Sequence, residues 1–313
     1  MMTQKIAGLT LAAVIIAIGF TSAQAQTADQ IFASGQENFR AKRYDDAIAD
    51  FRKYIATAGE DSGAYFNIGL AYYLTSRYND AIYAFQSSVR LKSDNPLTHR
   101  YLADSYYELK NYASAVPSYQ NCTKYDPRNE VCWIFLGNSL DYLSRYNEAI
   151  AAYMKAVEIN PKNHVAYAEI GVAHQRQKNY PAAIESLKKS IEIKSDYAFS
   201  HSNLGSAYYG QKNYTLALAS YKRAVELDPN NSENLKELGD TYFALKQWIM
   251  AEQNFIKAIA LNPKYQSAIY ELGRTYIMLR RLPSAKAQYN ALLPINEKLA
   301  ADLWAKYAAA GGK

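Results

Sequence analysis

Residues 198–231 read AFSHSNLGSAYYGQKNYTLALASYKRAVELDPNN and contain the complete pattern from which the fold can be predicted. The apolar residues of this stretch recur three and four positions apart on both sides of a break at residues 210–213, which is the pattern of two amphipathic helices joined by a turn. The small residues Gly205 and Ala217 stand among large aromatics, so the two helices can cross closely there. Asp228-Pro229 then ends the second helix, because proline has no amide donor and restricts the residue before it.

The same pattern returns every 34 residues from Ala28 to Leu299. One column holds a small residue in each second helix: Ala47, Ala81, Ala115, Ala149, Ala183, Ala217, Ala251 and Ala285. Another holds the small residue of each first helix: Gly35, Gly69, Ala103, Gly137, Gly171, Gly205, Gly239 and Gly273. Eight copies in step predict an all-α chain of stacked helix pairs, in which each pair contacts only its neighbours.

These columns resemble the tetratricopeptide repeat, whose pattern is Trp-x2-Leu-Gly-x2-Tyr in the first helix, Ala-x3-Phe in the second, and then Pro. The fourth copy matches it with Trp133, Leu136, Gly137, Ala149, Tyr153 and Pro161, although Leu140 stands where Tyr is expected. The resemblance implies a right-handed α-solenoid of eight helix-turn-helix units, at 28–61, 62–95, 96–129, 130–163, 164–197, 198–231, 232–265 and 266–299.

The two ends of the chain differ from the repeats. Residues 1–25 contain Lys5, an apolar run and then Ala23-Gln24-Ala25, a pattern typical of a secretory signal peptide cleaved after Ala25. The alternative is an uncleaved membrane anchor, since the run is near the lower length limit for a spanning helix. The repeats would fill 26–299, and 296–310 is predicted to form a C-terminal capping helix that overlaps the last repeat and covers its apolar side.

The net charge and the predicted export together limit the classes of partner that the protein is expected to bind. The formal charge is +6, and removal of the leader with Lys5 leaves about +5. In an exported protein this favours neither nucleic acid nor stable membrane insertion after cleavage, and indicates only a mild preference for acidic proteins or an anionic envelope surface. The expected location is the bacterial periplasm.

The two cysteines, Cys122 and Cys132, fall in columns that otherwise hold mostly small residues. Consecutive helices approach closely at such positions, so a disulfide that staples two units is geometrically reasonable in an oxidising compartment. Two buried free thiols are the alternative. No C-x-x-C is present, so redox catalysis is not indicated.

No catalytic constellation stands out. The four histidines, at positions 99, 164, 174 and 201, are interpreted mainly as substitutes for half-buried aromatics, and no HExxH, phosphate loop or nucleophile elbow occurs. The carboxylates are expected on repeating outer faces. The sequence thus predicts no catalytic, cofactor or metal site.

In the family that the chain resembles, the first helix of each unit lines a concave groove. Helical rotation then selects positions three residues before, one after and four after the glycine column as those that face away from the second helix. The candidate partner groove comprises Phe32, Phe66, Tyr73, Arg100, Tyr107, Asn138, Tyr209, Phe243 and Arg274. The asparagine ladder of repeats fused to sugar transferases is represented only by Asn67 and Asn203 in its column.

The favoured function is a non-enzymatic scaffold of the cell envelope that binds a segment of another protein in this groove. Two alternatives remain open at this point. One is self-association into an oligomer or filament, and the other is an accessory subunit of an envelope enzyme complex acting on cell wall or secretion substrates.

Overall fold

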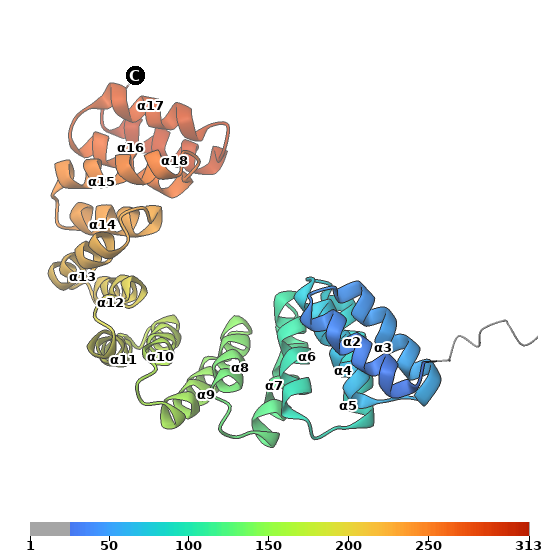
Figure 1. Cartoon of the computed structure of the whole chain (residues 1–313). Helices are drawn as coiled ribbons and strands as arrows, with labels where there is room; N and C mark the ends of the chain where they lie inside the picture. Colours follow the sequence, from blue (N-terminus) through green and yellow to red (C-terminus); the bar gives the residue numbers. More distant parts are fainter. Residues whose placement is uncertain (1–25, 313) are drawn as a thin grey trace, which may run out of the picture. The chain divides into compact units, whose positions relative to one another are not determined.

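The computed structural model describes residues 26–312, which contain seventeen α-helices and no strand (Figure 1). The all-α repeat solenoid predicted from the 34-residue period is confirmed. The predicted leader, residues 1–25, lies outside the described residues.

The chain divides into two compact units with a boundary between Asn111 and Tyr112. The described helices of unit 1 are α2 (Ala28–Arg40), α3 (Tyr44–Ala58), α4 (Ser62–Leu74), α5 (Tyr78–Leu91) and α6 (Pro96–Glu108). Those of unit 2 are α7 (Tyr112–Tyr125), α8 (Glu130–Tyr142), α9 (Tyr146–Ile159), α10 (His164–Arg176), α11 (Tyr180–Ile193), α12 (Ala198–Gly210), α13 (Tyr214–Leu227), α14 (Ser232–Ala244), α15 (Trp248–Leu261), α16 (Gln266–Met278), α17 (Leu282–Leu292) and α18 (Glu297–Ala309). Within each unit, helices pack mainly against their neighbours in chain order, which is how a solenoid distributes its core.

The crossing of each helix pair depends on the glycine column. A β-carbon at Gly137 would lie 2.4 Å from the ring of Tyr153, and one at Gly69 would lie 2.6 Å from the ring of Phe85. Both rings are fully buried, and every member of the alanine column is 0% exposed. The small residues therefore let a large ring of the second helix lie against the backbone of the first.

The turn within each repeat is also periodic. A non-glycine residue adopts the left-handed conformation, with φ between 58° and 61°, at eight positions spaced by 34: Lys42, Ser76, Lys110, Ser144, Lys178, Lys212, Lys246 and Arg280. Such a φ is uncommon for residues with a β-carbon. The turn geometry is consequently fixed by the packing of the two helices rather than by a glycine.

An aromatic N–H fastens the start of several first helices to the preceding turn. Trp133 Nε1 donates to the carbonyl of Pro127 at 2.9 Å. The imidazole Nε2 atoms of His99 and His201 lie 2.8 and 3.0 Å from the carbonyl oxygens of Ser93 and Ser195, again six residues earlier. These histidines thus occupy the place of the tryptophan, in agreement with their interpretation as aromatic substitutes.

The last helix, α18, covers the end of the array. Leu303 and Tyr307 are buried, and Leu303 lies in one apolar cluster with Ile269 and Leu292. A β-carbon at Gly273 would meet Leu303 at 2.5 Å, so Leu303 of α18 takes the place at this glycine that a large side chain of the second helix takes in earlier repeats.

Candidate functional site

The first helices of unit 1 carry a group of touching aromatic rings. Tyr101 lies between Phe66 and Tyr73, with ring centroids 6.0 and 5.4 Å away. All three side chains are partly buried against the core cluster. Because they are held by packing, they present a rigid and partly exposed aromatic surface.

Other predicted groove residues of unit 1 differ in their surroundings. Phe32 packs edge-on against Phe51 and Tyr54, at 5.3 and 4.9 Å, so it contacts the second helix instead of facing away from it. Phe32, with Gln36 and Tyr54, still borders a shallow cleft of about 380 Å³. Tyr107 is half-buried in α6.

Arg100 is the basic residue predicted to orient a partner. Its Nε lies 3.5 Å from Asp104 Oδ2 one turn away, and its guanidinium lies 5.4 Å from the Tyr101 ring centroid. Burial, and then the charges of Asp104 and Glu108, raise the pKa of Tyr73 to about 12. Tyr73 is therefore a neutral hydroxyl at any physiological pH.

In unit 2 the predicted groove residue Asn138 is hydrogen-bonded to a buried residue of the second helix. Its Oδ1 accepts a hydrogen bond from the hydroxyl of Tyr153 at 2.8 Å. Tyr153 is the ring that lies against Gly137. Asn138 is thus held by its own helix pair, which accounts for an asparagine at this position without a ligand.

A charged group occupies α8 and α10. Arg176 Nη1 lies 2.6 Å from Oδ2 of Asp141, whose side chain is only 10% exposed. Burial raises the pKa of Asp141, and Arg176 opposes this rise. Glu169 lies close to both, and burial, together with the charge of Asp141, raises its pKa to about 7 despite Arg176.

A second charged group lies on α14. Lys236 Nζ lies 2.8 Å from Asp240 and 3.0 Å from Glu237, and all three side chains are mostly buried. Burial raises the pKa of Asp240 to about 7 against the pull of Lys236. Burial opposes the charge on Lys236, yet the attraction of Asp240 and Glu237 outweighs it and raises the pKa of the ammonium.

Three remaining groove residues form aromatic and cation contacts. Tyr209 packs edge-on against Tyr214 at 5.1 Å, and burial raises its pKa to about 12. Arg274 places its guanidinium 4.7 Å from the Phe243 ring centroid and pairs with Glu271 at 2.8 Å. Phe243 and Arg274 therefore meet across neighbouring repeats.

The sequence reasoning missed the column two residues before the glycine. It supplies Tyr101, Glu169, Glu237 and Glu271, which the structure brings beside the predicted groove residues. The signal was present in the sequence, because three of the eight residues in this column are glutamates. The expectation that carboxylates lie on outer faces was wrong for Asp104 and Asp141, which are buried on first helices.

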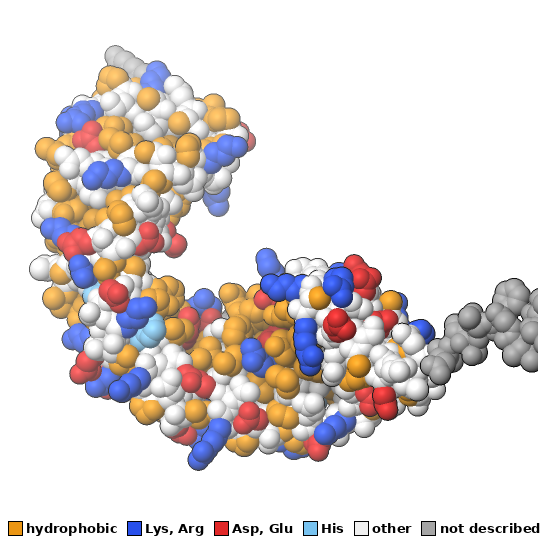
Figure 2. Space-filling view, in the orientation of Figure 1, with side chains coloured by type: hydrophobic (Ala, Val, Ile, Leu, Met, Phe, Trp, Pro, Cys, Tyr) orange, Lys and Arg blue, Asp and Glu red, His pale blue; other side chains and the backbone are white. Residues whose placement is uncertain are grey.

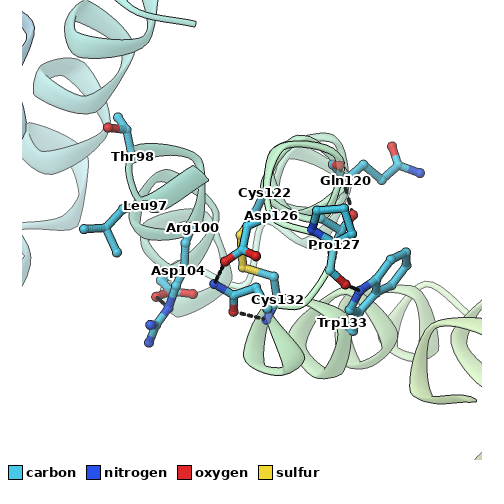
Figure 3. Close-up of a disulfide and its surroundings, with 12 residues drawn as sticks. Leu97, Thr98, Arg100, Asp104, Gln120, Cys122, Asp126, Pro127, Cys132 and Trp133 are labelled. Atoms are coloured by element: carbon cyan, nitrogen blue, oxygen red, sulfur yellow. Dashed lines mark hydrogen bonds and ion pairs between the residues drawn. A yellow bond between two sulfur atoms is a disulfide. The ribbon is translucent and has the colours of Figure 1, made fainter. Parts of the chain in front are cut away.

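Cys122 and Cys132 are joined by a disulfide, with an S–S distance of 2.01 Å and Cα atoms 6.3 Å apart (Figure 3). The bond ties the end of α7 to the first turn of α8, beside Asp126 and Pro127. Both cysteines are fully buried. The link therefore braces the junction between two successive repeats and leaves no exposed thiol there.

Charges elsewhere do not gather by sign on the visible surface. Figure 2 shows a face on which basic and acidic side chains are interspersed. Among residues 26–312, no group of three His, Cys, Asp or Glu side chains could hold a metal ion. In the same residues no helix has the length and apolarity needed to cross a membrane.

Comparison with known families agrees with the repeat geometry. Models described as tetratricopeptide repeat match residues 32–96, 102–129, 131–163, 152–185, 198–231 and 220–253, and one described as TPR repeat matches residues 176–212. The chain belongs to the tetratricopeptide-repeat family. No curated protein matches the chain.

Solved structures with a similar fold are also repeat proteins. A chain of the APC/C hetero-tetramer Cut9–Hcn1 is 17% identical with a TM-score of 0.61, over 95% of this chain and 59% of that one. The C-terminal part of a TPR repeat-containing protein from Cytophaga hutchinsonii is 23% identical with a TM-score of 0.62, over 76% and 98%. MamA protein is 22% identical with a TM-score of 0.52, over 55% and 94%. This chain thus spans less than two thirds of the Cut9–Hcn1 chain, and the likenesses show a shared fold.

Proposed function

We propose that this protein is an exported, non-enzymatic scaffold of the cell envelope that binds an extended segment of another protein along its first helices. The observation that carries the proposal is the aromatic group of Phe66, Tyr73 and Tyr101, held by the core yet partly exposed. Aromatic side chains that are already fixed lose little conformational freedom on binding, so they make effective anchors.

The surroundings of the aromatic group suit an extended peptide. Gln36, Asn67 and Arg40 border a cleft of about 180 Å³, which lies between α2 and α4 and offers hydrogen-bonding groups beside Phe39. A partner segment could place apolar side chains on the rings and its backbone against these amides. Membership of a family of protein-binding repeats supports the same function.

Export is supported by two separate features. Residues 1–25 have the composition of a signal peptide, and the Cys122–Cys132 disulfide suits an oxidising compartment. Mass spectrometry of the protein recovered from a periplasmic extract tests this step. A mature N-terminus at Gln26 is expected, and a retained Met1 in the cytoplasmic or membrane fraction would overturn it.

The binding surface is tested with a random twelve-residue peptide library displayed on phage and selected against the oxidised chain 26–313. Tyr73→Ala removes an anchor and is expected to weaken the selected peptides at least tenfold. Tyr83→Ala is the matched control, because Tyr83 is 73% exposed on the second helix α5. Equal affinity for the two variants would place binding elsewhere and contradict the proposal.

A further inference from the structure

The net charge of the first helices of unit 2 is negative, whereas that of the whole chain is positive. The chain has 35 Lys and Arg against 29 Asp and Glu. Across α8, α10, α14 and α16, the charged groups described above contain five carboxylates and only three cations. The carboxylates are Asp141, Glu169, Glu237, Asp240 and Glu271, and the cations are Arg176, Lys236 and Arg274. This set is called the acidic wall. A basic segment would be attracted to it even though the protein as a whole is basic.

Two carboxylates of the acidic wall, Asp141 and Asp240, each have a buried oxygen without a hydrogen-bond partner among residues 26–312. Asp141 is 7% exposed, and its Oδ2 pairs with Arg176. Its Oδ1 is buried and has no hydrogen-bond partner among residues 26–312. A buried carboxylate oxygen without a donor is costly, so its presence points to a donor that the chain itself does not supply.

Two further acceptors, Glu169 and Gln175, lie on α10, and Glu169 is only partly buried. Glu169, which is close enough to interact with Asp141 and Arg176, makes no hydrogen bond or ion pair with any described residue. Gln175, on the same helix, donates from Nε2 to Ser206, but its Oε1 is buried without a donor. When Asp141 and Glu169 are both ionised, they carry one negative charge more than the guanidinium of Arg176 can balance.

We propose that Asp141 and Glu169 bind the side-chain cation of a lysine or arginine in the partner segment that lies along the acidic wall. The inference rests on the proposed function, because it specifies the chemistry of the segment. An ammonium carries three donors and a guanidinium five, which matches an arrangement of acceptors without donors. Charge-assisted hydrogen bonds in such a half-buried place are stronger than on an open surface.

Arg176 can move to admit this cation, because its side chain is 43% exposed and pairs with only one oxygen of Asp141. Asp141 Oδ1 is buried, so the cation reaches it only when Arg176 moves aside, whereas Glu169 is only partly buried. The proposed ligand is a protein side chain and not a free polyamine, because further carboxylates, Glu237, Asp240 and Glu271, lie on the first helices α14 and α16 of later repeats. A chain of residues can follow that row, with one cation in the α8–α10 position.

The test uses a second selection from the same library against the oxidised chain 26–313. Peptides that do not respond to Tyr73→Ala are kept, because Tyr73 belongs to unit 1 and the acidic wall to unit 2, and their affinities are measured by fluorescence anisotropy. The selected sequences are expected to share a Lys or Arg at one position. Glu169→Gln should weaken the peptide at least tenfold, and replacement of that Lys in the peptide by norleucine should do the same. The two losses should not add, because both remove one contact. Glu192→Gln on α11 is the matched control, since it changes the charge equally at an exposed carboxylate paired with Lys189.

The outcomes separate the inference from the function on which it rests. Peptides that bind without a shared basic position, or that bind Glu169→Gln as tightly as the wild type, would overturn the cation site and leave the scaffold standing. Failure to select any peptide would remove both. Spermidine that displaces the peptide at equal concentration would make the ligand a small polycation and overturn the inference. A scattering mass that rises with protein concentration and falls with added peptide would identify a second copy of this chain as the occupant, with the same consequence.

Discussion

The close crossing of α8 and α9 allows a quantitative prediction about Gly137. A methyl group at this position would lie 2.4, 2.6 and 2.8 Å from three ring carbons of Tyr153. The ring cannot easily move aside, because it is 1% exposed and its hydroxyl is bonded to Asn138 at 2.8 Å. Gly137→Ala should therefore overpack the crossing, at a cost of about 1–3 kcal/mol.

The higher helix propensity of alanine stabilises α8 and so opposes the cost of overpacking. Alanine is a better helix former than glycine by about 1 kcal/mol, so the single variant alone measures only the difference between two effects. In a Tyr153→Ala background the clash is absent and only the gain remains. The double-mutant cycle removes the shared helix term, and the coupling energy should equal the clash, about 1–3 kcal/mol.

Hydrogen exchange of amides in α8 and α9 is the suitable assay, because a solenoid can open locally and a global midpoint would mix several repeats. Exchange in α16, three repeats away, serves as an internal reference. A coupling energy below about 0.5 kcal/mol would refute the reasoning, because the effects of two independent substitutions add within that margin.

Two other predictions follow from the same structure. Burial raises the pKa of Glu169 from 4.5 to about 7, so the unfolded chain loses this proton at lower pH than the folded chain, and the free energy of unfolding should fall as pH rises from about 4.5 to 7. In urea unfolding, Glu169→Gln should abolish that fall and add up to about 3 kcal/mol at pH 8, with no gain below pH 4. An unchanged pH profile would contradict the placement of Glu169. The Cys122–Cys132 bond closes a loop of 10 residues' separation, so comparison of oxidised and dithiothreitol-reduced protein should show a loss of about 2–3 kcal/mol around α7 and α8, and a loss below about 1 kcal/mol would show that the bond does not brace the junction.

The columns that build the core could be predicted from the sequence alone. A residue such as Ala149 or Gly137 has no side chain to adapt, so its position every 34 residues directly records where two backbones approach. The turn was located as a break at residues 210–213, but its conformation was not foreseen. Lys212 adopts a φ of 61° although lysine has no preference for that region, because the packed helices on both sides determine the path of the chain.

The charged groups of the wall were harder to predict for a different reason. Helical rotation places a residue on a face, but the burial of a carboxylate depends on what the next repeat puts beside it. Asp141 is buried in the company of Arg176, which lies 35 residues later on α10. The rotation rule placed Asp104 and Asp141 on the groove side, but it treated each repeat separately and so gave no indication that they are buried.

The free-energy cost of the acidic wall bears on its purpose. Glu169 and Asp240 are both carboxylates whose pKa burial raises to about 7, and the equivalent of Glu169 in the next repeat is the neutral Asn203. A carboxylate that serves stability alone should give a more stable protein than its amide, whereas a carboxylate that serves binding can give a less stable one. Glu169→Gln distinguishes these cases, because the binding role requires greater stability at pH 8 and weaker peptide affinity in one variant. Loss of both properties together would mean that Glu169 serves the fold.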